Sequence, residues 1–457
     1  MGKLFGTDGM RGEADKYPMD APTVFSVGRA VTGFFSSETG RPKIVVGRDT
    51  RVSGPAIESA LQAGIISSGG TVCLTGVLPT PAIALITESV LAHAGIVISA
   101  SHNPYTDNGI KIFSGQGLKL TDADQDALEK LISADRSDGK LSERAPEPDG
   151  LPPVVRLQDS ADRYLRFLAG TLAPGFSLQG LKIVLDTANG ATYQVAPDLF
   201  TRLGATLEVI HNRPNGININ HQCGSEHTRD LENRVRDTGA AVGLAFDGDG
   251  DRLIAVDENG RKITGDQALL ICAKALKRQN RLKNDLLVTT IMSNIGLNIA
   301  CRKLGIHHHA ADVGDRYVLE AMQRLGGVVG GEDSGHMIFL DYHKTGDGIL
   351  AALQLIGAML GEGKPLSELS KLMEVYPQKL INVAVGGKPD LSGVLPVRAV
   401  IQSVEARLKD SGRVLVRYSG TQNVCRVMVE GPGRQDTDAF CEEIAGVIQQ
   451  AIGRSAG

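Results

Sequence analysis

One pattern constrains the fold more than any other: an apolar, β-branched run, a helical segment, a glycine and a second apolar run. It occurs first in "KIVVGRDTRVSGPAIESALQAGIISSGGTVCLTG", where Ser53 and Pro55 open the helix and Gly69-Gly70 ends it. It recurs in "LKIVLDTANGATYQVAPDLFTRLGATLEVI" from Leu181 and in "DLLVTTIMSNIGLNIACRKLGIHHHA" from Asp285. Three such βαβ units predict three α/β domains of related layout.

The remaining segments predict where these domains end. The stretch from Ser133 to Pro153 is charged, rich in proline and glycine and without periodicity, which is typical of a surface connection. Near the C-terminus, "VIQSVEARLKD" predicts a helix, "RVLVRY" and "CRVMVEG" predict strands, and "TDAFCEEIAGVIQQAIG" predicts a closing helix. The last module is therefore expected to be a small α+β domain.

Composition excludes several classes of protein. The 457 residues carry a net charge of -4, contain no tryptophan and are only 4% aromatic, so neither bulk charge nor stacking supports nucleic-acid binding. No apolar run approaches the roughly 18 residues that span a bilayer, and the N-terminus lacks an apolar signal core, so we expect a cytoplasmic protein with no membrane partner. The six cysteines form no C-x-x-C pair and are expected to be reduced thiols rather than disulfides or zinc ligands.

The segment "AFDGDGDRLIAVDENG" places Asp247, Asp249 and Asp251 after an apolar strand. Converging carboxylates raise one another's pKa unless a cation holds them together, so a divalent metal is the expected partner. A calcium loop of the EF-hand type is an alternative, but Arg252 stands where that loop requires glycine. A solvated acidic turn is the other alternative. Magnesium held by a few carboxylates usually binds phosphate oxygens as well, which points to a phosphorylated substrate or side chain.

A second segment, "VRYSGTQNVCRVMVEG", is suited to phosphate. It offers hydroxyl groups, backbone N–H groups around a glycine and two guanidinium groups, from Arg417, Ser419, Gly420, Thr421 and Arg426. An exposed hairpin is the alternative interpretation. No Walker loop and no G-x-G-x-x-G after a strand is present, so nucleotide phosphates are not indicated.

Two further polar segments leave more than one interpretation. In "GGEDSGHMIF", Glu332, Ser334 and His336 stand on alternate residues and could bind sugar hydroxyls from one face, but a structural loop would look the same. The consecutive histidines 307–309 would alternate between the faces of a strand, which favours a structural role over a metal site.

The segment "ISASHNPYTDNGIKIF" sets Ser101 beside His102 and ends in an asparagine–glycine turn signal. If Ser101 is a nucleophile, its activation is unexplained at first, because adjacent side chains on an extended backbone point to opposite faces. His102 is therefore not expected to serve Ser101 as a general base in the manner of a catalytic triad.

In this order and spacing, "FGTDGMRG", "ISASHNP", "FDGDGDR", "GGEDSGH" and "VRYSGT" resemble the α-D-phosphohexomutase superfamily over essentially the whole chain. Other segments, such as "RPNGININHQCGS" and "KTGDGILAALQL", are most similar to the branch that acts on glucosamine phosphates rather than on mannose or glucose phosphates. The resemblance implies four domains around a central active-site cleft. These are α/β domains over residues 1–152, 153–254 and 255–372, with the phosphoserine, metal and sugar loops, and a movable α+β phosphate-binding domain over residues 373–457.

The resemblance also implies roles for single residues. Ser101 would carry the phosphoryl group, and one Mg²⁺ per active site would bind Asp247, Asp249, Asp251 and a phospho-Ser101 oxygen. Arg11 and Lys111, from loops expected to close on Ser101, would add positive charge together with Arg252. Lys111, with a pKa expected to be depressed by these cations, is the first candidate for proton exchange, and His102 would position the loop. Glu332, Ser334, His336 and Arg316 would bind the sugar, and Arg417, Ser419, Gly420, Thr421 and Arg426 its phosphate.

The chain departs from the family pattern at two places. Tyr418, Gln422 and Asn423 replace two prolines and a glutamate of the usual phosphate loop. Asp333 replaces the more common glutamine and would lie near a substrate ammonium or face water.

The implied reaction interconverts glucosamine 6-phosphate and glucosamine 1-phosphate through glucosamine 1,6-bisphosphate, and so supplies precursors of UDP-N-acetylglucosamine and the cell wall. The expected partners are a hexosamine phosphate, the sugar bisphosphate and a second copy of the chain in a homodimer. Alternatives are a mutase that prefers mannose or glucose phosphates, a metal-dependent sugar phosphatase, and a non-catalytic calcium-binding module. The first alternative is tested by the relative rates on the three sugar phosphates, and the second by release of inorganic phosphate. The third is tested by Ser101→Ala, which would change only metal affinity.

Overall fold

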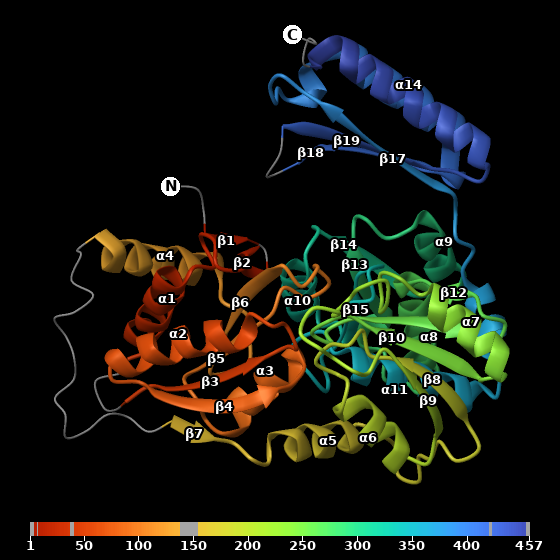
Figure 1. Ribbon diagram of the computed structural model, residues 1–457. Helices are drawn as coiled ribbons and strands as arrows, with labels where there is room; N and C mark the ends of the chain where they lie inside the picture. The colour runs from red at the N-terminus through yellow and green to blue at the C-terminus, as the bar shows by residue number, and fades with distance from the viewer. Residues whose placement is uncertain (1–3, 7, 37–40, 138–153, 420–422, 454–457) are drawn as a thin grey trace. The chain divides into compact units, whose positions relative to one another are not determined.

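The structure is a computed structural model that describes residues 4–6, 8–36, 41–137, 154–419 and 423–453. It divides into two compact units, of which the first comprises Met1–Met292 with Ile306–Leu372 and the second Ser293–Gly305 with Met373–Gly457. The first unit holds three sheets and the second a fourth, smaller one (Figure 1). The expected α/β layout with a small C-terminal α+β domain is confirmed.

The first sheet has the strand order β1-β2-β6-β5-β3-β4-β7. Four neighbouring strands are parallel, namely β7, β4, β3 and β5. The other three are added by antiparallel pairing, in the order β6, β2 and β1. The strands are β1 (Phe5–Gly6), β2 (Gly9–Glu13), β3 (Lys43–Arg48), β4 (Thr71–Val77), β5 (Ala94–Ile98), β6 (Asp107–Ser114) and β7 (Val154–Arg156).

Helices α1 (Ala21–Phe34), α2 (Gly54–Ser67) and α4 (Asp122–Ser137) share one apolar core with this sheet, and α3 (Thr80–Ser89) lies on its other face. The Asp20 side chain caps α1 by accepting a hydrogen bond from the Thr23 N–H group. Helices α1 and α2 approach so closely that a Cβ at Gly64 would lie 2.1 Å from the Phe25 carbonyl oxygen.

The second sheet has the order β12-β11-β10-β8-β9, with β10, β8 and β9 parallel. Its strands are β8 (Lys182–Asp186), β9 (Thr206–Ile210), β10 (Val242–Phe246), β11 (Leu253–Asp257) and β12 (Lys262–Ile263). Helices α5 (Ser160–Gly170), α6 (Val195–Arg202) and α7 (Arg229–Thr238) belong to the same stretch of chain.

The third sheet has the order β14-β13-β15-β16, formed by β13 (Leu286–Thr290), β14 (His307–Ala311), β15 (Val329–Gly331) and β16 (Met337–Phe339). Its helices are α8 (Gly265–Arg278), α10 (Asp315–Leu325), α11 (Gly348–Glu362) and α12 (Leu366–Leu369). A capping box between Thr264 and Gln267 fixes the start of α8.

The second unit contains an antiparallel sheet in the order β17-β19-β18, from β17 (Gln378–Ala384), β18 (Arg413–Tyr418) and β19 (Val424–Glu430). Helices α13 (Leu395–Leu408) and α14 (Arg434–Ile452) share its apolar core. Helix α9 (Ile295–Lys303) belongs to this unit too, because the buried Glu430 carboxylate accepts hydrogen bonds from the Ile295 N–H group and from Arg413.

Several boundaries differ from those expected. Strand β7 completes the first sheet beyond residue 152, and β11 crosses the expected boundary at 254 because β10, β11 and β12 form one antiparallel meander. Residues 133–137 form the last turn of α4 rather than a connection, while residues 138–153 lie outside the described part of the chain. The break after residue 372 coincides with the division between the two units.

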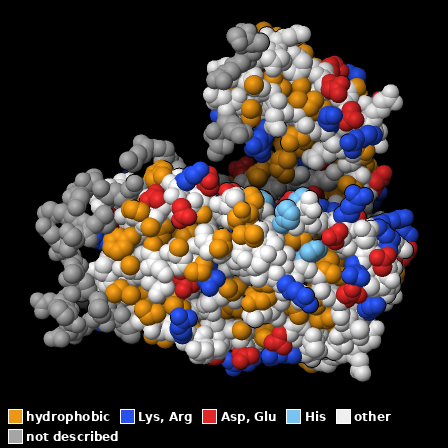
Figure 2. Space-filling model, viewed as in Figure 1, with side chains coloured by type: hydrophobic (Ala, Val, Ile, Leu, Met, Phe, Trp, Pro, Cys, Tyr) orange, Lys and Arg blue, Asp and Glu red, His pale blue; other side chains and the backbone are white. Residues whose placement is uncertain are grey.

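All six cysteines are buried and none forms a disulfide, as expected of reduced thiols. In the face seen in Figure 2, acidic and basic side chains are interspersed rather than gathered by sign. Among the described residues, no single helix is long and apolar enough to cross a membrane; α11 with the segment Leu366–Leu372 would be, but the two meet at an angle of 89°.

Candidate active site

The order of the strands in the first sheet reverses beside β3. β3 lies between β4 and β5, and the chain passes from β3 to β4 and then crosses to β5 on the other side. Such reversals, at the carboxyl ends of the strands, are where open α/β sheets bind ligands. The loop after β5 carries Ser101, and the loop after β3 carries Asp49 and Arg51.

Ser101 is buried in a turn with a left-handed backbone, at φ 53°. Its hydroxyl group donates to Asp247 Oδ2 at 2.6 Å, and Oγ lies 3.3 Å from Nδ1 of His102. The expectation that Ser101 and His102 point to opposite faces is wrong, because this backbone is not extended. Burial and the neighbouring Arg252 lower the pKa of His102, which leaves its imidazole uncharged near neutral pH.

A fully buried ion pair holds the Ser101 loop in place. Arg51 Nε donates to Asp49 Oδ2 at 2.8 Å, and the Ser99 hydroxyl donates to the same oxygen at 2.6 Å. The other guanidinium nitrogens donate to loop carbonyl oxygens, those of Ser101 and Asn103 at 2.9 Å, Asp107 at 3.0 Å, and Pro104. From the second sheet, Asn220 Nδ2 also donates to the Ser101 carbonyl oxygen, at 2.8 Å. The loop is thus fixed before any substrate binds.

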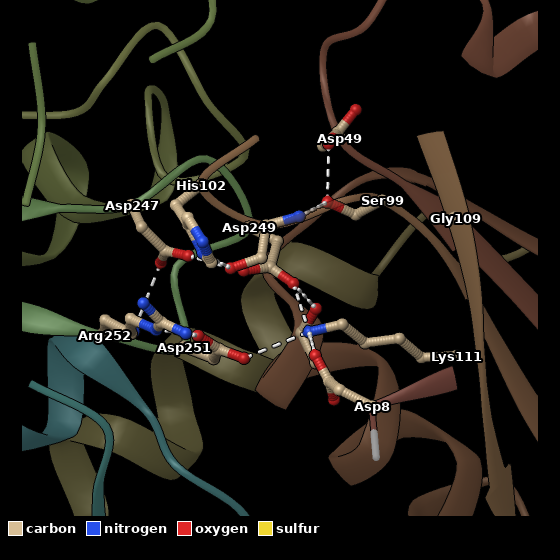
Figure 3. A network of polar contacts seen from close by, with 12 residues as sticks. Asp8, Asp49, Ser99, His102, Gly109, Lys111, Asp247, Asp249, Asp251 and Arg252 are labelled. Carbon is tan, nitrogen blue, oxygen red and sulfur yellow. Dashed lines mark hydrogen bonds and ion pairs between the residues drawn. The ribbon is translucent and has the colours of Figure 1, made fainter. Parts of the chain in front are cut away.

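The aspartates follow β10 in the second sheet and meet Ser101 directly. A Cβ at Gly248 would lie 2.5 Å from the Ser101 carbonyl oxygen, so only glycine allows the two loops to approach this closely. Thr80, at the start of α3, donates to Asp249 Oδ2 at 2.6 Å. The three aspartates therefore lie at the junction of the first and second sheets (Figure 3).

Lys111 extends from β6 into this acidic cluster. Its ammonium group lies 2.8 Å from Asp249 Oδ2, 3.1 Å from Asp251 Oδ2 and 3.0 Å from Asp8 Oδ2 (Figure 3). Burial alone would lower the pKa of Lys111, but the three carboxylates outweigh it and raise the pKa well above its ordinary value. The expectation of a depressed pKa is wrong, because carboxylates rather than cations surround the amine. Lys111 and Arg11 also lie on neighbouring strands, β6 and β2, rather than on loops.

The aspartate loop fits a divalent cation. One oxygen from each of Asp247, Asp249 and Asp251 lies within 4.8 Å of the others, and all three residues are buried. Oδ1 of Asp249 and Oδ1 of Asp251 are buried without a hydrogen-bond partner. Burial and the other two aspartates raise the pKa of Asp247 well above its ordinary value. A cation here would coordinate the two carboxylate oxygens that lack a hydrogen bond and would offset the negative charge of the three aspartates.

The remaining basic residues expected here lie at the edge of the cluster. The Arg252 N–H group donates to Asp247 Oδ1 at 3.2 Å, while its guanidinium group lies 3.9 Å from Asp251 Oδ1 and 3.4 Å from Glu226 Oε1. Arg11 pairs with Asp8.

The "GGEDSGH" segment is a turn rather than a strand, so its side chains do not share one face. Gly335 N–H donates to the Glu332 carbonyl oxygen at 3.0 Å. His336 is buried, with Nδ1 3.7 Å from Asp251 Oδ1 and Nε2 3.3 Å from Asp315 Oδ2, and these carboxylates raise its pKa although burial would lower it. His336 therefore belongs to the aspartate cluster.

The other residues of that segment also have neighbours within the fold. Glu332 Oε1 accepts from the Gly314 N–H group at 3.1 Å, and Ser334 Oγ is buried without a hydrogen-bond partner. Asp333 Oδ1 accepts from the Asp266 N–H group at 3.1 Å in the first turn of α8, so its carboxylate stabilises a helix start.

Arg316 is held by a neighbouring carboxylate. Its guanidinium group makes two hydrogen bonds to the exposed Asp122, at 2.8 and 2.6 Å. Arg316 nevertheless lines a small pocket together with Asp8, Lys111 and Lys119. Lys119 bridges Asp8 and Asp315, and so connects the first and third sheets beside the cluster.

The expected phosphate cradle lies in the second unit. Arg417 on β18 is paired directly with Arg426 on β19, which puts both side chains on one face of the sheet. Arg426 Nε is buried without a hydrogen-bond partner. Lys388 Nζ donates to the Ser419 carbonyl oxygen at 2.7 Å, and the Tyr418 hydroxyl group donates to Pro389 at 2.8 Å. Gly420, Thr421 and Gln422 lie outside the described residues.

Several residues at the site were not singled out from the sequence. They are Asp49 and Arg51, which hold the Ser101 loop, Thr80, which donates to Asp249, Asp8, which pairs with Lys111, and Lys119, which pairs with Asp8. Asp8 stands within "FGTDGMRG", and Asp49 and Arg51 within "VGRDTRVSG". A charged pair directly after an apolar parallel strand is the signal that could have identified Asp49 and Arg51.

Sequence profiles of one family match four consecutive parts of the chain. They are described as phosphoglucomutase/phosphomannomutase α/β/α domains I, II and III, matching residues 2–138, 162–260 and 264–376, and the C-terminal domain, matching residues 380–447.

Known proteins resemble the chain over its whole length. The phosphoglucosamine mutase of Syntrophobacter fumaroxidans is 62% identical, and that of Syntrophus aciditrophicus 53%, each over 99% of this chain and 100% of the relative. A phosphoglucomutase/phosphomannomutase family protein from Burkholderia thailandensis shares the fold with a TM-score of 0.79 at 24% identity, covering 98% of this chain and 97% of the other. N-acetylphosphoglucosamine mutase from Aspergillus fumigatus, solved with GlcNAc-6P and magnesium, superposes with a TM-score of 0.67 at 17% identity, covering 98% and 96%.

The four matched domains, the fold and the full-length identity to curated relatives agree with the site geometry. The chain is an isomerase and belongs to the phosphoglucosamine mutases of the α-D-phosphohexomutase superfamily.

Proposed function

We propose that the mutase reaction, the interconversion of glucosamine 6-phosphate and glucosamine 1-phosphate, takes place at Ser101. The observation that carries this assignment is the 2.6 Å hydrogen bond from the Ser101 hydroxyl group to Asp247, inside a buried cluster of aspartates. The hydroxyl is held by a preformed loop and faces a group of charges that suits a phosphate and its counter-ion.

The reaction is an exchange of one phosphoryl group in two steps. In the first, the bond between phosphorus and Ser101 Oγ breaks as a bond to O1 of glucosamine 6-phosphate forms. The O1 proton leaves and Ser101 Oγ regains a proton, which gives glucosamine 1,6-bisphosphate. In the second, the phosphoryl group on O6 returns to Ser101 Oγ and glucosamine 1-phosphate is released. A solved relative described as a complex with glucose 1,6-bisphosphate supports a bisphosphate intermediate.

Asp247, Asp249, Asp251 and an oxygen of phospho-Ser101 would hold Mg²⁺, which when bound would neutralise charge on the transferring group. The unpartnered Asp249 and Asp251 oxygens support this assignment, as does the fungal relative solved with magnesium. Lys111 and Arg11 would add positive charge from the first sheet, and Arg252 from the second. His102, with Nδ1 3.3 Å from Ser101 Oγ, is a further side chain within reach for proton exchange, besides Asp247 Oδ2 at 2.6 Å.

Substrate contacts would come from two regions. Glu332 and Ser334 would bind sugar hydroxyls, and the unpartnered Ser334 Oγ supports this role. Arg417, Ser419, Gly420, Thr421 and Arg426 would hold the phosphate that is not being transferred, with Lys388 as a further cation. The paired position of the two arginines on β18 and β19 supports the cradle.

Peptide mass spectrometry of the purified chain, before and after exposure to the sugar bisphosphate, tests the proposal. We expect one phosphate on the peptide containing Ser101, and its loss in Ser101→Ala together with all mutase activity. Ser59→Ala, on an exposed surface of α2, is the matched control and should retain both. An active chain that never carries phosphate on Ser101 would refute the assignment. Release of inorganic phosphate in step with substrate loss would indicate a phosphatase instead.

A further inference from the structure

A second group of potential metal ligands lies outside the aspartate cluster. One atom from each of Asp186, His211 and Cys223 lies within 4.8 Å of the other two. Asp186 is the last residue of β8, His211 directly follows β9, and Cys223 lies in the loop before α7. Because β8 and β9 are parallel neighbours with Asp186 paired to Ile210, their carboxyl ends bring the first two ligands together.

The imidazole of His211 is oriented as in metal sites. Nδ1 is buried and lies 3.1 Å from Asp186 Oδ2; this contact, together with Asp230, raises the pKa of His211, so a metal at Nδ1 would displace a proton. Nε2 lies 3.4 Å from Asp230 Oδ2 in the first turn of α7. A metal-bound histidine almost always donates its second ring N–H to a carboxylate, which fixes the ring and leaves the other nitrogen free to bind the ion.

The other two ligands are preorganised and buried. The Asp186 carboxylate accepts backbone hydrogen bonds from Ala188 and Gly224, both at 2.9 Å, and retains lone pairs toward His211. Cys223 is only 1% exposed, and burial, with Asp186 and Asp230, raises the pKa of its thiol to about 12.

We propose that Asp186 Oδ2, His211 Nδ1 and Cys223 Sγ bind a borderline-soft divalent cation, best fitted by Zn²⁺, with a water as the fourth ligand. Bonds of about 2.0–2.3 Å at tetrahedral angles place the ligand atoms about 3.3–3.8 Å apart, a spacing compatible with the observed cluster. Binding releases the Cys223 thiol proton to solvent and forms a sulfur–metal bond. The thiolate excludes Mg²⁺, so this site and the all-oxygen aspartate loop select different ions.

The cation would be coupled to the mutase site through the loop that carries Cys223. Asn220, in the same loop, donates to the Ser101 and Asn103 carbonyl oxygens at 2.8 and 3.1 Å. Beyond the cysteine, the Ser225 N–H group donates to the Phe246 carbonyl oxygen at 3.0 Å, directly before Asp247. Tethering Cys223 to the ends of β8 and β9 would therefore stabilise both sides of the Ser101–Asp247 contact. The sequence expectation that no cysteine binds zinc is revised here, because the ligands come from three separate segments rather than from a C-x-x-C pair.

Titration of the metal-free, full-length chain with Co²⁺ tests the site, because a thiolate ligand gives cobalt a charge-transfer absorption that oxygen and nitrogen ligands do not. We expect this absorption in the unaltered chain and in Asp249→Asn, which alters only the aspartate loop. Cys223→Ser should abolish it, and Cys73→Ser, another buried cysteine, should retain it. Asp230→Asn, on a largely exposed side chain, should weaken Zn²⁺ binding about 10–100-fold in a competition titration.

The absence of the thiolate absorption in the unaltered chain, or its persistence in Cys223→Ser, would overturn the proposal. Should Cys223→Ser fail to fold, Asp230→Asn and His211→Gln decide the matter. Unchanged Zn²⁺ affinity in both of these variants would overturn the proposal equally, and weakened affinity in both would support it.

Discussion

At the scale of single residues, the site contains a buried lysine whose positive charge is offset by neighbouring carboxylates. Lys111 lies among Asp8, Asp249 and Asp251, and its ammonium group is 2% exposed. Removing one partner of a buried ion pair typically destabilises a protein by about 3–5 kcal/mol, because the other charge is left uncompensated. Lys111 therefore stabilises the folded acidic cluster, whatever further role it has in the reaction.

The first prediction distinguishes the effect of the metal on turnover from its effect on folding stability. Dialysis into Mg²⁺-free buffer should abolish turnover yet shift the thermal midpoint by only a few degrees, because Lys111 already offsets two of the aspartates. Asp249→Asn should lower kcat by about 10²–10³ or more with an unchanged circular dichroism spectrum. The buried Asp257→Asn, whose carboxylate only accepts backbone hydrogen bonds in the 257–261 turn, is the control. Near-normal turnover of Asp249→Asn would show that the reaction does not depend on a metal at this site.

The second prediction concerns Arg51, which positions the Ser101 loop without touching the reacting atoms. Arg51→Lys keeps the charge beside Asp49 but loses the planar fork that reaches four carbonyl oxygens. We expect phosphorylation of Ser101 by the sugar bisphosphate to slow about 10–100-fold, with KM nearly unchanged. Arg48→Lys, at the end of the strand that precedes the Arg51 loop and paired with Glu58, is the control and should retain the normal rate. An equal loss in both variants would refute a specific positioning role.

At the scale of elements, the sequence predicts what depends on local periodicity. The three strand–helix–strand segments were predictable because each has an apolar parallel strand followed by a helix that ends near a glycine, although α9 of the third segment belongs to the second unit. Strand β17 was not, because "QKLINVA" alternates weakly and is defined by its pairing with β19. The Asn108-Gly109 turn signal misleads as well. Gly109 lies inside β6, where a Cβ would meet the Ser99 and Met10 carbonyl oxygens at 2.6 and 2.8 Å, so close contact rather than a turn requires it.

The third prediction concerns the segment before α11. His343 is buried, with Nε2 donating to the Pro81 carbonyl oxygen of α3 at 3.1 Å and Nδ1 accepting from the Thr345 N–H group at 3.2 Å. Burial lowers its pKa to about 4. Because the unfolded chain, with a histidine pKa of about 6.5, binds the proton more readily, stability should fall as the pH drops from about 6.5 to about 4, by about 3 kcal/mol.

Urea unfolding at a series of pH values measures this effect. His343→Gln should be less stable near neutral pH but lose less stability across the acid range than the unaltered chain. The exposed His227→Gln is the control. An identical acid slope in the unaltered chain and in His343→Gln would contradict the assignment.

At the scale of the whole molecule, the active site requires parts of the chain that are far apart in sequence. Asp8, Ser101 and Lys111 come from the first sheet, the three aspartates from the second, and His336 from the third. Local patterns identified Ser101 and the three aspartates as candidates, because carboxylates, glycines and hydroxyls cluster after strands, whereas Lys111 came from the family resemblance. Their meeting was implied only by the resemblance, since periodicity does not determine which sheets adjoin. The Lys111–Asp8–Lys119–Asp315 chain of ion pairs was missed for the same reason.

The fourth prediction concerns the second unit. Arg417→Ala should raise KM for glucosamine 6-phosphate about 10–100-fold, because a charge-assisted contact to a phosphate is lost, and should lower kcat much less. Arg434→Ala, an exposed arginine on α14 of the same unit, should leave both constants unchanged. Steady-state kinetics on both variants measures this. A loss confined to kcat would show that Arg417 does not hold the phosphate of the bound substrate.

Lys111 has one more consequence, for the order of events in the cell. A protein whose buried carboxylates are neutralised only by a metal ion must bind that ion before it can fold stably. In this chain the counter-ion is the Lys111 side chain, which is present as soon as the polypeptide is made. Its synthesis and its loading with metal can therefore be separate events, so that scarcity of the ion would yield idle enzyme rather than misfolded protein.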